Sequence, residues 1–223
     1  MDKYAIIVAG GSGQRMGSET PKQFLLLKGK PIIHYALKAF IDAFDDIRII
    51  LVLPKDHLPL GEQIINAFQT TNKIKLTSGG KTRFHSVKNG LQFVTHPSIV
   101  FVHDGVRCLV TKQLIHNCFD QALEKGSAIP AIIPSDSMRM TKGNTHVTIN
   151  REDVRIIQTP QTFMSEIIIQ AFEQVYNESF TDEATVVEAA GNKVYLIEGE
   201  YSNIKITRPI DLCIAENLID SIA

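Results

Sequence analysis

The chain has 223 residues, of which 44% are hydrophobic and 21% charged, and this length and composition suit one soluble globular domain. A formal net charge of −1, no apolar window long enough for a membrane span and no signal peptide argue against nucleic acid and membrane partners and predict a cytoplasmic protein. The three cysteines are odd in number and include no Cys-x-x-Cys pair, which argues against a disulfide framework or a zinc site.

The first predicted element is a strand at residues 4–8, where a short apolar run ends abruptly in glycine. Such a run suits a strand that is buried on both faces in a parallel sheet. Residues 9–13 (AGGSG) follow, and glycines let main-chain N–H groups turn inward around an anion. Arg15 and Lys22 add positive charge. The stretch predicts a pocket for the phosphates of a nucleoside triphosphate; a glycine-rich turn with two solvated cations is the alternative.

The loop matches neither of two familiar phosphate motifs. A Walker loop needs Lys-Ser or Lys-Thr directly after its last glycine, but Gly13 is followed by Gln14 and Arg15. A dinucleotide fingerprint that starts at Gly11 would need glycine or alanine in place of Met16, and no acidic residue closes the next strand. The spacing therefore argues against both motifs.

Strands and helices alternate along the rest of the chain. A short extended piece is predicted at residues 24–27. Strands are predicted at residues 47–53, 74–76, 99–103, 127–134 and 194–197. Helices are predicted at residues 31–40, 60–68, 86–93, 114–123, 167–175 and 209–219. Residues 181–184 are predicted to cap one more helix, which follows them directly. This alternation predicts an open α/β sheet. A second glycine turn at 78–83 follows a strand, and ligands bind beyond the carboxyl ends of such strands.

The strand at 99–103 brings Asp104 to the same edge of the sheet. A carboxylate at the end of a buried strand, directly before Gly105, is well placed to bind a metal ion. Magnesium is the metal expected, because it takes oxygen ligands and completes its shell with water and substrate phosphates. An ordinary Asp-Gly turn is the alternative, and His103 is expected to serve packing.

Residues 135–153 break the alternation of strands and helices. Polar and apolar residues alternate on both sides of Gly143 and Asn144, which predicts a β-hairpin. Because the sheet has no obvious place for it, we expect residues 136–153 to form an arm that projects from a single domain of residues 1–223. Exposed strand edges are usually covered, and a second subunit is one way to cover them.

Several of these segments together resemble one enzyme family. They are residues 9–16 with 21–23, 79–80 with Arg83 and 86–87, 103–104 with Arg107, 136–138, Arg151, 159–161, 181–184 and 203–211. In order and spacing they resemble the cytidylyltransferases that make CDP-linked polyols, and most closely the 2-C-methyl-D-erythritol 4-phosphate cytidylyltransferase family of the non-mevalonate isoprenoid pathway. The match extends over nearly the whole chain.

The resemblance implies a Rossmann-like nucleotidyltransferase fold, with a mostly parallel sheet flanked by helices, and a homodimer whose hairpin arms interlock. It also implies a Mg²⁺-dependent reaction of CTP with a polyol phosphate to give a CDP-polyol and pyrophosphate. Attack of a phosphate oxygen on the α-phosphorus brings anions together, so fixed cations should matter more than a general base. Arg15, Lys22 and Lys205 are the residues that we expect to stabilise the transition state.

By the same resemblance, further residues would bind the substrates. Those expected around the nucleotide are Ala9, Gly10, Gly11, Gly13, Gly80, Lys81, Ser86 and Asp104. Asp104 would also hold the magnesium ion. Those expected around the polyol phosphate, some of them from the partner's arm, are Arg107, Ser137, Arg151, Thr159 and Lys205.

The identity of the polyol depends on two short stretches. Residues 105–108 are Gly-Val-Arg-Cys where the family usually has Ala-Ala-Arg-Pro, and Gly-Val-Arg also occurs in the related ribitol-5-phosphate cytidylyltransferases. Residues 136–139 keep the methylerythritol pattern of Asp, a hydroxyl residue, an aliphatic side chain and a cation. We therefore favour methylerythritol phosphate, with a ribitol-5-phosphate cytidylyltransferase as the alternative. A nucleotide-binding protein that lacks catalysis is the alternative from another class, and fold alone does not exclude it.

Overall fold

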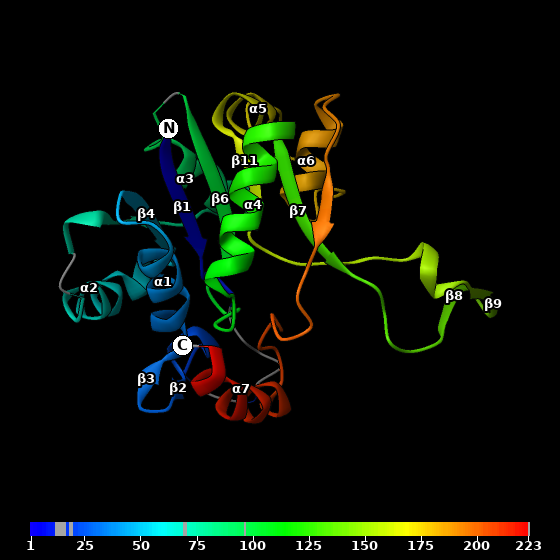
Figure 1. The fold of residues 1–223 in the computed structure, drawn as a ribbon, viewed down its shortest axis with the longest axis horizontal. Helices are drawn as coiled ribbons and strands as arrows, with labels where there is room; N and C mark the ends of the chain where they lie inside the picture. The colour runs from blue at the N-terminus through cyan, green and yellow to red at the C-terminus, as the bar shows by residue number, and fades with distance from the viewer. Residues whose placement is uncertain (12–16, 18–19, 69–70, 96, 223) are drawn as a thin grey trace.

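The computed structural model describes residues 1–11, 17, 20–68, 71–95 and 97–222. Within these ranges, eight strands form one sheet in the order β10-β7-β11-β6-β1-β4-β5, with β12 also paired to β7 (Figure 1). The strands are β1 (Asp2–Val8), β4 (Ile47–Leu53), β5 (Ile74–Ser78), β6 (Ser98–Asp104), β7 (Ser127–Ile132), β10 (Ile156–Ile157), β11 (Gln161–Met164) and β12 (Leu196–Glu198). With helices on both faces, this mostly parallel sheet confirms the predicted fold class.

Strand β1 lies where the order of the parallel strands reverses. β4 and then β5 follow it on one side and β6 lies on the other, and all four strands run parallel. Val8 is paired with Asp104, so the chain leaves β1 and β6 at the same edge of the sheet. Open α/β sheets bind their ligands at such a switch point.

Helices cover both faces of the sheet (Figure 1). Alternate residues of β1 enter different apolar clusters: Ala5 and Ile7 belong to one, Tyr4 and Ile6 to the other. The first cluster includes side chains of α1 (Ile32–Ala43), α2 (Leu58–Asn66) and α4 (Lys112–Lys125), and the second those of α3 (Arg83–Leu91), α5 (Ser165–Ala171) and α6 (Glu183–Ala189). Burial on both faces is the reason that β1 is apolar along nearly its whole length.

A third apolar cluster joins the C-terminal helix α7 (Pro209–Ile222) to the turn after β6. Ala215 of α7, Ile206 and Val106 are all buried in it, together with Leu27 of the small β2 (Leu26–Leu27) and β3 (Lys30–Pro31) pair. The main-chain N–H of Ile206 donates to the oxygen of Val106 at 3.0 Å. This contact places Lys205 beside the end of β6.

The remaining helices are short 3-10 turns. Within the described ranges they lie at Lys22–Phe24, Lys55–His57, Thr71–Lys73 and Arg151–Asp153. No helix in these ranges is long and apolar enough to cross a bilayer.

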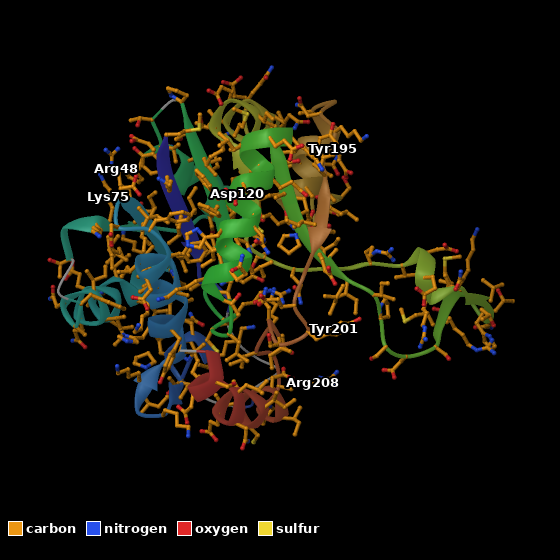
Figure 2. The ribbon with its side chains drawn as sticks, viewed as in Figure 1. Arg48, Lys75, Asp120, Tyr195, Tyr201 and Arg208 are labelled. Carbon is orange, nitrogen blue, oxygen red and sulfur yellow. The ribbon has the colours of Figure 1, made fainter. Side chains whose placement is uncertain are left out.

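Strands β8 (Met138–Lys142) and β9 (Thr145–Ile149) form the antiparallel hairpin that the sequence predicts. It stands away from the sheet, and its side chains lie clear of the rest of the chain (Figures 1 and 2). Met140 and Val147 face each other in the register, and they are 57% and 55% exposed. Coverage of this hairpin by a second subunit stays a prediction.

The sequence does not predict strand β11, which lies antiparallel between β6 and β7. Its four residues include Gln161 and Thr162, which are polar but buried, so they show none of the apolar pattern that marks β1 or β4. The predicted strand at 127–134 also ends earlier, at Ile132. The observed β4 coincides with the strand predicted at 47–53.

Candidate active site

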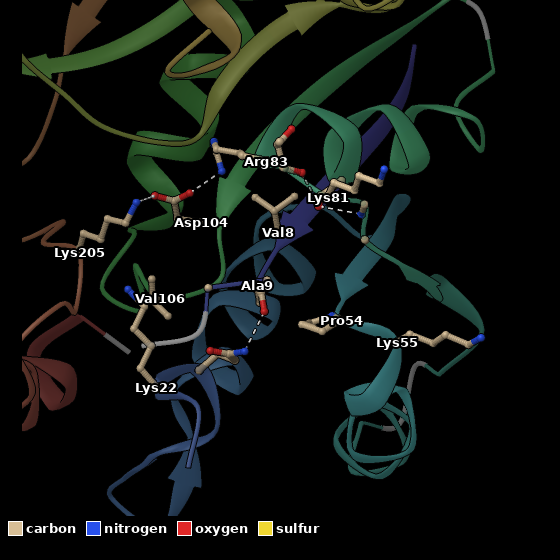
Figure 3. A pocket seen from close by; sticks show the side chains of 17 residues that line it. Val8, Ala9, Lys22, Pro54, Lys55, Lys81, Arg83, Asp104, Val106 and Lys205 are labelled. Carbon is tan, nitrogen blue, oxygen red and sulfur yellow. Dashed lines mark hydrogen bonds and ion pairs between the residues drawn. The ribbon is translucent and has the colours of Figure 1, made fainter. Parts of the chain in front are cut away.

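A cavity of about 500 Å³ opens at the carboxyl ends of β1, β4, β5 and β6 (Figure 3). Among the described residues that line it, the cations outnumber the acids by five to one. The charged residues are Lys22, Lys55, Lys81, Arg83 and Lys205, with Asp104 as the acid. A pocket with this charge balance attracts a polyanion.

The glycine loop after β1 forms one wall of the cavity through Ala9, Gly10 and Gly11. The N–H of Ala9 donates to the oxygen of Val52 at 3.0 Å, and its carbonyl accepts from the Nε2 amide of Gln23 at 2.8 Å. The N–H of Ala9 is therefore engaged within the protein, while its carbonyl keeps a second lone pair for a ligand. Two expected site residues, Gly13 and Arg15, lie outside the described residues.

The second glycine turn forms the opposite wall, and its own hydrogen bonds shape it. The N–H of Gly80 donates to Oγ of Ser86 at 3.1 Å, and that hydroxyl donates to the oxygen of Thr82 at 3.0 Å. A Cβ at Gly80 would lie 2.4 Å from Cβ of His85, so the turn packs against α3 only with glycine here. Lys81 is exposed at the mouth of the cavity.

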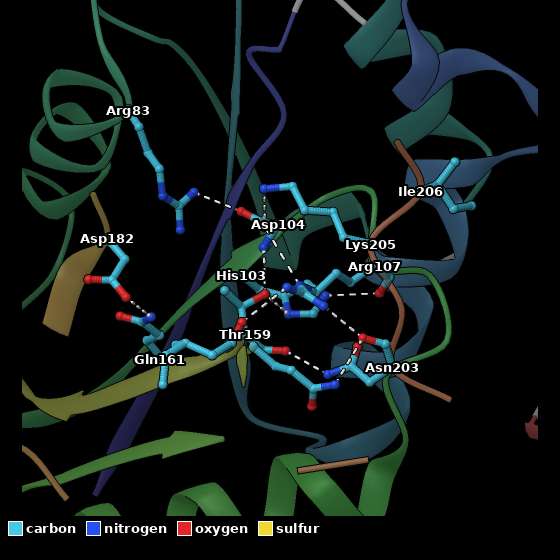
Figure 4. Close-up of polar contacts among 12 residues, drawn as sticks. Arg83, His103, Asp104, Arg107, Thr159, Gln161, Asp182, Asn203, Lys205 and Ile206 are labelled. Atoms are coloured by element: carbon cyan, nitrogen blue, oxygen red, sulfur yellow. Dashed lines mark hydrogen bonds and ion pairs between the residues drawn. The ribbon is translucent and has the colours of Figure 1, made fainter. Parts of the chain in front are cut away.

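Asp104 lies between cations on the wall of the cavity (Figures 3 and 4). Oδ1 is 2.8 Å from Nη1 of Arg83, and Oδ2 is 2.9 Å from Nζ of Lys205 and 3.7 Å from Nε of Arg107. Burial raises the pKa of Asp104, but these three charges outweigh burial and hold its pKa well below the usual range. The carboxylate is therefore ionised at neutral pH.

Lys22 reaches the same region from the opposite side. Its Nζ donates to the main-chain oxygen of Ile206 at 3.1 Å, and Ile206 directly follows Lys205 in the chain. Lys22 is 9% exposed and Lys205 has a side chain that is 43% exposed. Both line the cavity, so the structure brings together two of the three cations expected to stabilise the transition state.

Arg83 lines the cavity, although the sequence predicts no role for it. Its guanidinium contacts Asp104 and also Oε2 of Glu183, at 2.7 Å. Burial raises the pKa of Glu183, while the charge of Arg83 opposes that effect. Its place three residues after Gly80, at the exit of a strand, could have marked Arg83 as a ligand-facing cation.

Arg107 and Thr159, both expected near the polyol phosphate, are buried next to Asp104 (Figure 4), and neither lines the cavity of this chain. Arg107 donates through Nη1 to the oxygen of Asn203 at 2.7 Å and through Nη2 to that of Ile157 at 3.4 Å. Burial lowers the pKa of Arg107, although Asp104 opposes this. The Thr159 hydroxyl accepts from the N–H of Asp104 at 3.0 Å.

Ser137 and Arg151 lie on the hairpin segment, and neither lines the cavity of the same chain. Both are exposed, and Arg151 donates through Nη1 to the oxygen of Ser135 at 2.7 Å. One chain therefore does not bring these two residues to Lys22 and Asp104.

A cationic pocket at the switch point of an open α/β sheet is typical of α/β proteins that bind anionic nucleotides. A sequence model described as 2-C-methyl-D-erythritol 4-phosphate cytidylyltransferase (IspD) matches residues 4–221. The chain belongs to this family.

Curated relatives and solved structures agree with this assignment. Proteins named 2-C-methyl-D-erythritol 4-phosphate cytidylyltransferase from Bacteroides fragilis and Azobacteroides pseudotrichonymphae are 43% and 46% identical to the chain; each match covers 98% of this chain, and 100% and 99% of the relative. The crystal structure of the 4-diphosphocytidyl-2C-methyl-D-erythritol synthase of Anaerococcus prevotii superimposes with a TM-score of 0.83 at 28% identity, over 98% of both chains. The bifunctional IspDF of Campylobacter jejuni gives a TM-score of 0.80 at 28% identity, over 96% of this chain and 54% of that one.

Proposed function

We propose that this protein transfers the cytidylyl group of CTP to 2-C-methyl-D-erythritol 4-phosphate, giving 4-diphosphocytidyl-2-C-methyl-D-erythritol and pyrophosphate. Family membership supports this substrate over ribitol 5-phosphate. The structural observation that supports catalysis is the convergence of Lys22, Lys205 and Arg83 around Asp104 in one cavity. Family membership also argues against a protein that only binds a nucleotide.

In the proposed mechanism, the triphosphate lies between the two glycine turns. Main-chain groups of Gly10, Gly11 and Lys81 contact the nucleotide, and the hydroxyl of Ser86 holds Gly80 in place. An oxygen of the polyol phosphate attacks the α-phosphorus in line with the departing pyrophosphate. The attacking oxygen is already ionised at neutral pH, so no side chain has to remove a proton.

Charge stabilisation is the main task of the protein in this reaction. Negative charge gathers on the oxygens of the five-coordinate phosphorus, and fixed cations stabilise it without reorganisation. Lys205 and Lys22 are held near each other by the contact of Lys22 with Ile206, so both can face one phosphorus centre. We propose the same role for Arg15, on the basis of the resemblance alone.

The residues present fit a magnesium ion that is bound jointly with the triphosphate. No group of three or more His, Cys, Asp or Glu side chains in the described ranges could hold a metal without the substrate. Magnesium often binds through one carboxylate, with substrate phosphates and water completing its shell, and Asp104 provides an ionised carboxylate on the cavity wall. We propose that Asp104 would hold this ion, with Lys205 and Arg83 beside it to contact the phosphates. When bound, the ion would neutralise charge on the triphosphate oxygens.

We also propose that the functional unit is a homodimer and that the hairpin of one subunit completes the site of the other. The exposed apolar pair Met140 and Val147 supports this, because isolated two-stranded hairpins are marginally stable in water. Ser137 and Arg151, two groups suited to a phosphate, are absent from the cavity of their own chain. A partner's hairpin would supply them.

The proposed reaction is tested by pyrophosphate release. We expect release from CTP only when 2-C-methyl-D-erythritol 4-phosphate and Mg²⁺ are both present. Binding of CTP without turnover of any polyol phosphate would contradict the proposal and favour a nucleotide-binding protein.

A further inference from the structure

His103 lies directly before Asp104 in β6 and is completely buried, and the proposed mechanism gives it no part. Its imidazole has two polar partners. Nε2 lies 3.0 Å from the main-chain oxygen of Arg107, and Nδ1 lies 3.1 Å from the hydroxyl of Thr159 (Figure 4). A role in packing alone would not require either contact.

The chemistry of the partners fixes where the protons lie. A carbonyl only accepts, so Nε2 of His103 carries a hydrogen and donates it to Arg107. In a neutral ring, Nδ1 then accepts the hydrogen of the Thr159 hydroxyl. The same hydroxyl oxygen accepts from the N–H of Asp104. One directed chain of hydrogen bonds thus runs from Asp104 through Thr159 and His103 to Arg107.

The Thr159 hydroxyl can accept from Asp104 because the main-chain hydrogen bonds between β11 and β6 end next to Thr159. The pairing of β11 with β6 ends at Gln161 and Val102, so it does not extend to Asp104. The main-chain oxygen of Thr159 is engaged by Nδ2 of Asn203 at 2.9 Å. The hydroxyl of Thr159 therefore takes the place of a ladder acceptor for Asp104.

We propose that His103 is a positioning residue that holds both ends of the turn from Asp104 to Arg107 and so aims the Asp104 carboxylate at Lys205 and Arg83. The turn is closed by the N–H of Arg107, which donates to the oxygen of Asp104 at 3.0 Å. Through the Thr159 hydroxyl, His103 fixes the N–H of Asp104 at the start of the turn. Through its own Nε2, it fixes the carbonyl of Arg107 at the end of the turn. The inference rests on the cytidylyl transfer proposed above.

A double-mutant cycle tests this role. In His103→Gln the amide nitrogen can still donate to Arg107, but the acceptor for Thr159 is lost, and Thr159→Val removes the hydroxyl. We expect each variant to lower kcat about tenfold or more, with KM for CTP changed less than about threefold, because misplacement of a catalytic group is costly. Since both act through one hydrogen bond, the double variant should be no worse than the more impaired single variant.

Phe40→Leu is the matched control for loss of packing. The Phe40 ring lies edge-on to the His103 ring, with centroids 5.2 Å apart, and makes no polar contact with it. This variant should lower the melting temperature but leave kcat within about twofold, because it leaves the hydrogen-bond chain intact. Wild-type kcat in His103→Gln, or losses that multiply in the double variant, would overturn the inference.

A measurement on the unaltered protein keeps the inference testable if a variant fails to fold. Nitrogen-15 NMR of the histidine side chains should show His103 as the Nε2–H tautomer. The Nδ1–H tautomer would overturn the inference. Wild-type turnover reports on the proposed function, whereas the tautomer needs no substrate, so failure of one is distinguishable from failure of the other.

Discussion

At the scale of single residues, the site depends on the charge balance at Asp104. One buried carboxylate faces Arg83 and Lys205 at hydrogen-bond distance, with Arg107 slightly further away. The only other acid in contact with these cations, among the described residues, is Glu183 on Arg83. The cluster thus keeps excess positive charge, which an incoming triphosphate can neutralise.

Lys205→Ala removes the most exposed of these cations. We expect kcat to fall about a hundredfold or more, with a smaller change in KM for CTP, because the charge is needed mainly in the transition state. Lys112→Ala is the control, since Lys112 is an exposed lysine outside the cavity. Like Lys205 it pairs with a carboxylate, because its Nζ lies 3.8 Å from Oδ2 of Asp42. It should keep kcat within about twofold. A pure KM effect of Lys205→Ala would place this lysine in ground-state binding.

Asp104→Asn tests the proposed magnesium ligand. The Mg²⁺ concentration for half-maximal activity should rise about tenfold or more, because a neutral amide binds this ion more weakly than a carboxylate. Titration of activity with Mg²⁺ after treatment with a chelator measures it. Asp46→Asn removes an exposed carboxylate that pairs with Lys3 and should leave the titration unchanged. An identical titration for Asp104→Asn would contradict the assignment.

At the scale of elements, helix α1 contains a group that makes stability depend on pH. His34 is buried in α1 and stacked on Phe68, and burial, with Lys30 and Lys38 nearby, lowers the pKa of His34 to about 4. The unfolded chain binds a proton near pH 6.5, so the contribution of His34 to stability is present above that pH and is lost as the pH falls toward 4.

Urea unfolding measures this effect. From pH 7 to pH 5 the wild-type protein should lose on the order of 1 kcal/mol through His34. In His34→Gln the loss over the same interval should be smaller by about that amount, since the amide does not titrate. His116→Gln, at another histidine that contacts an aromatic ring, serves as the control. An equal loss in wild type and His34→Gln would refute the assignment.

The sequence predicted most elements because their apolar patterns reflect burial. β4 is buried on both faces, and the strand predicted at 47–53 has the observed bounds. β11 could not be predicted, since its buried Gln161 is satisfied by Asp182 and the N–H of Ala184, partners that only the fold brings close. The burial of Arg107 likewise depends on a contact with Asn203, which lies far along the chain.

At the scale of the whole molecule, the proposed dimer has a direct test. A heterodimer is purified in which one subunit carries Arg151→Ala and the other Lys22→Ala, each inactive in its own homodimer. If each hairpin serves the partner, one site receives both defects and the other neither, so about half of the wild-type activity should return, provided that the sites act independently. If each hairpin serves its own subunit, every site keeps one defect and no activity returns.

A competition experiment between two polyol phosphates tests the identity of the reaction. The protein is given CTP, Mg²⁺ and equal concentrations of 2-C-methyl-D-erythritol 4-phosphate and ribitol 5-phosphate, and the CDP-linked products are separated by mass spectrometry. We predict 4-diphosphocytidyl-2-C-methyl-D-erythritol in excess of CDP-ribitol by about tenfold or more, since the ratio reports kcat/KM for the two substrates. CDP-ribitol in equal or greater amount, or no CDP-linked product, would contradict the proposed reaction.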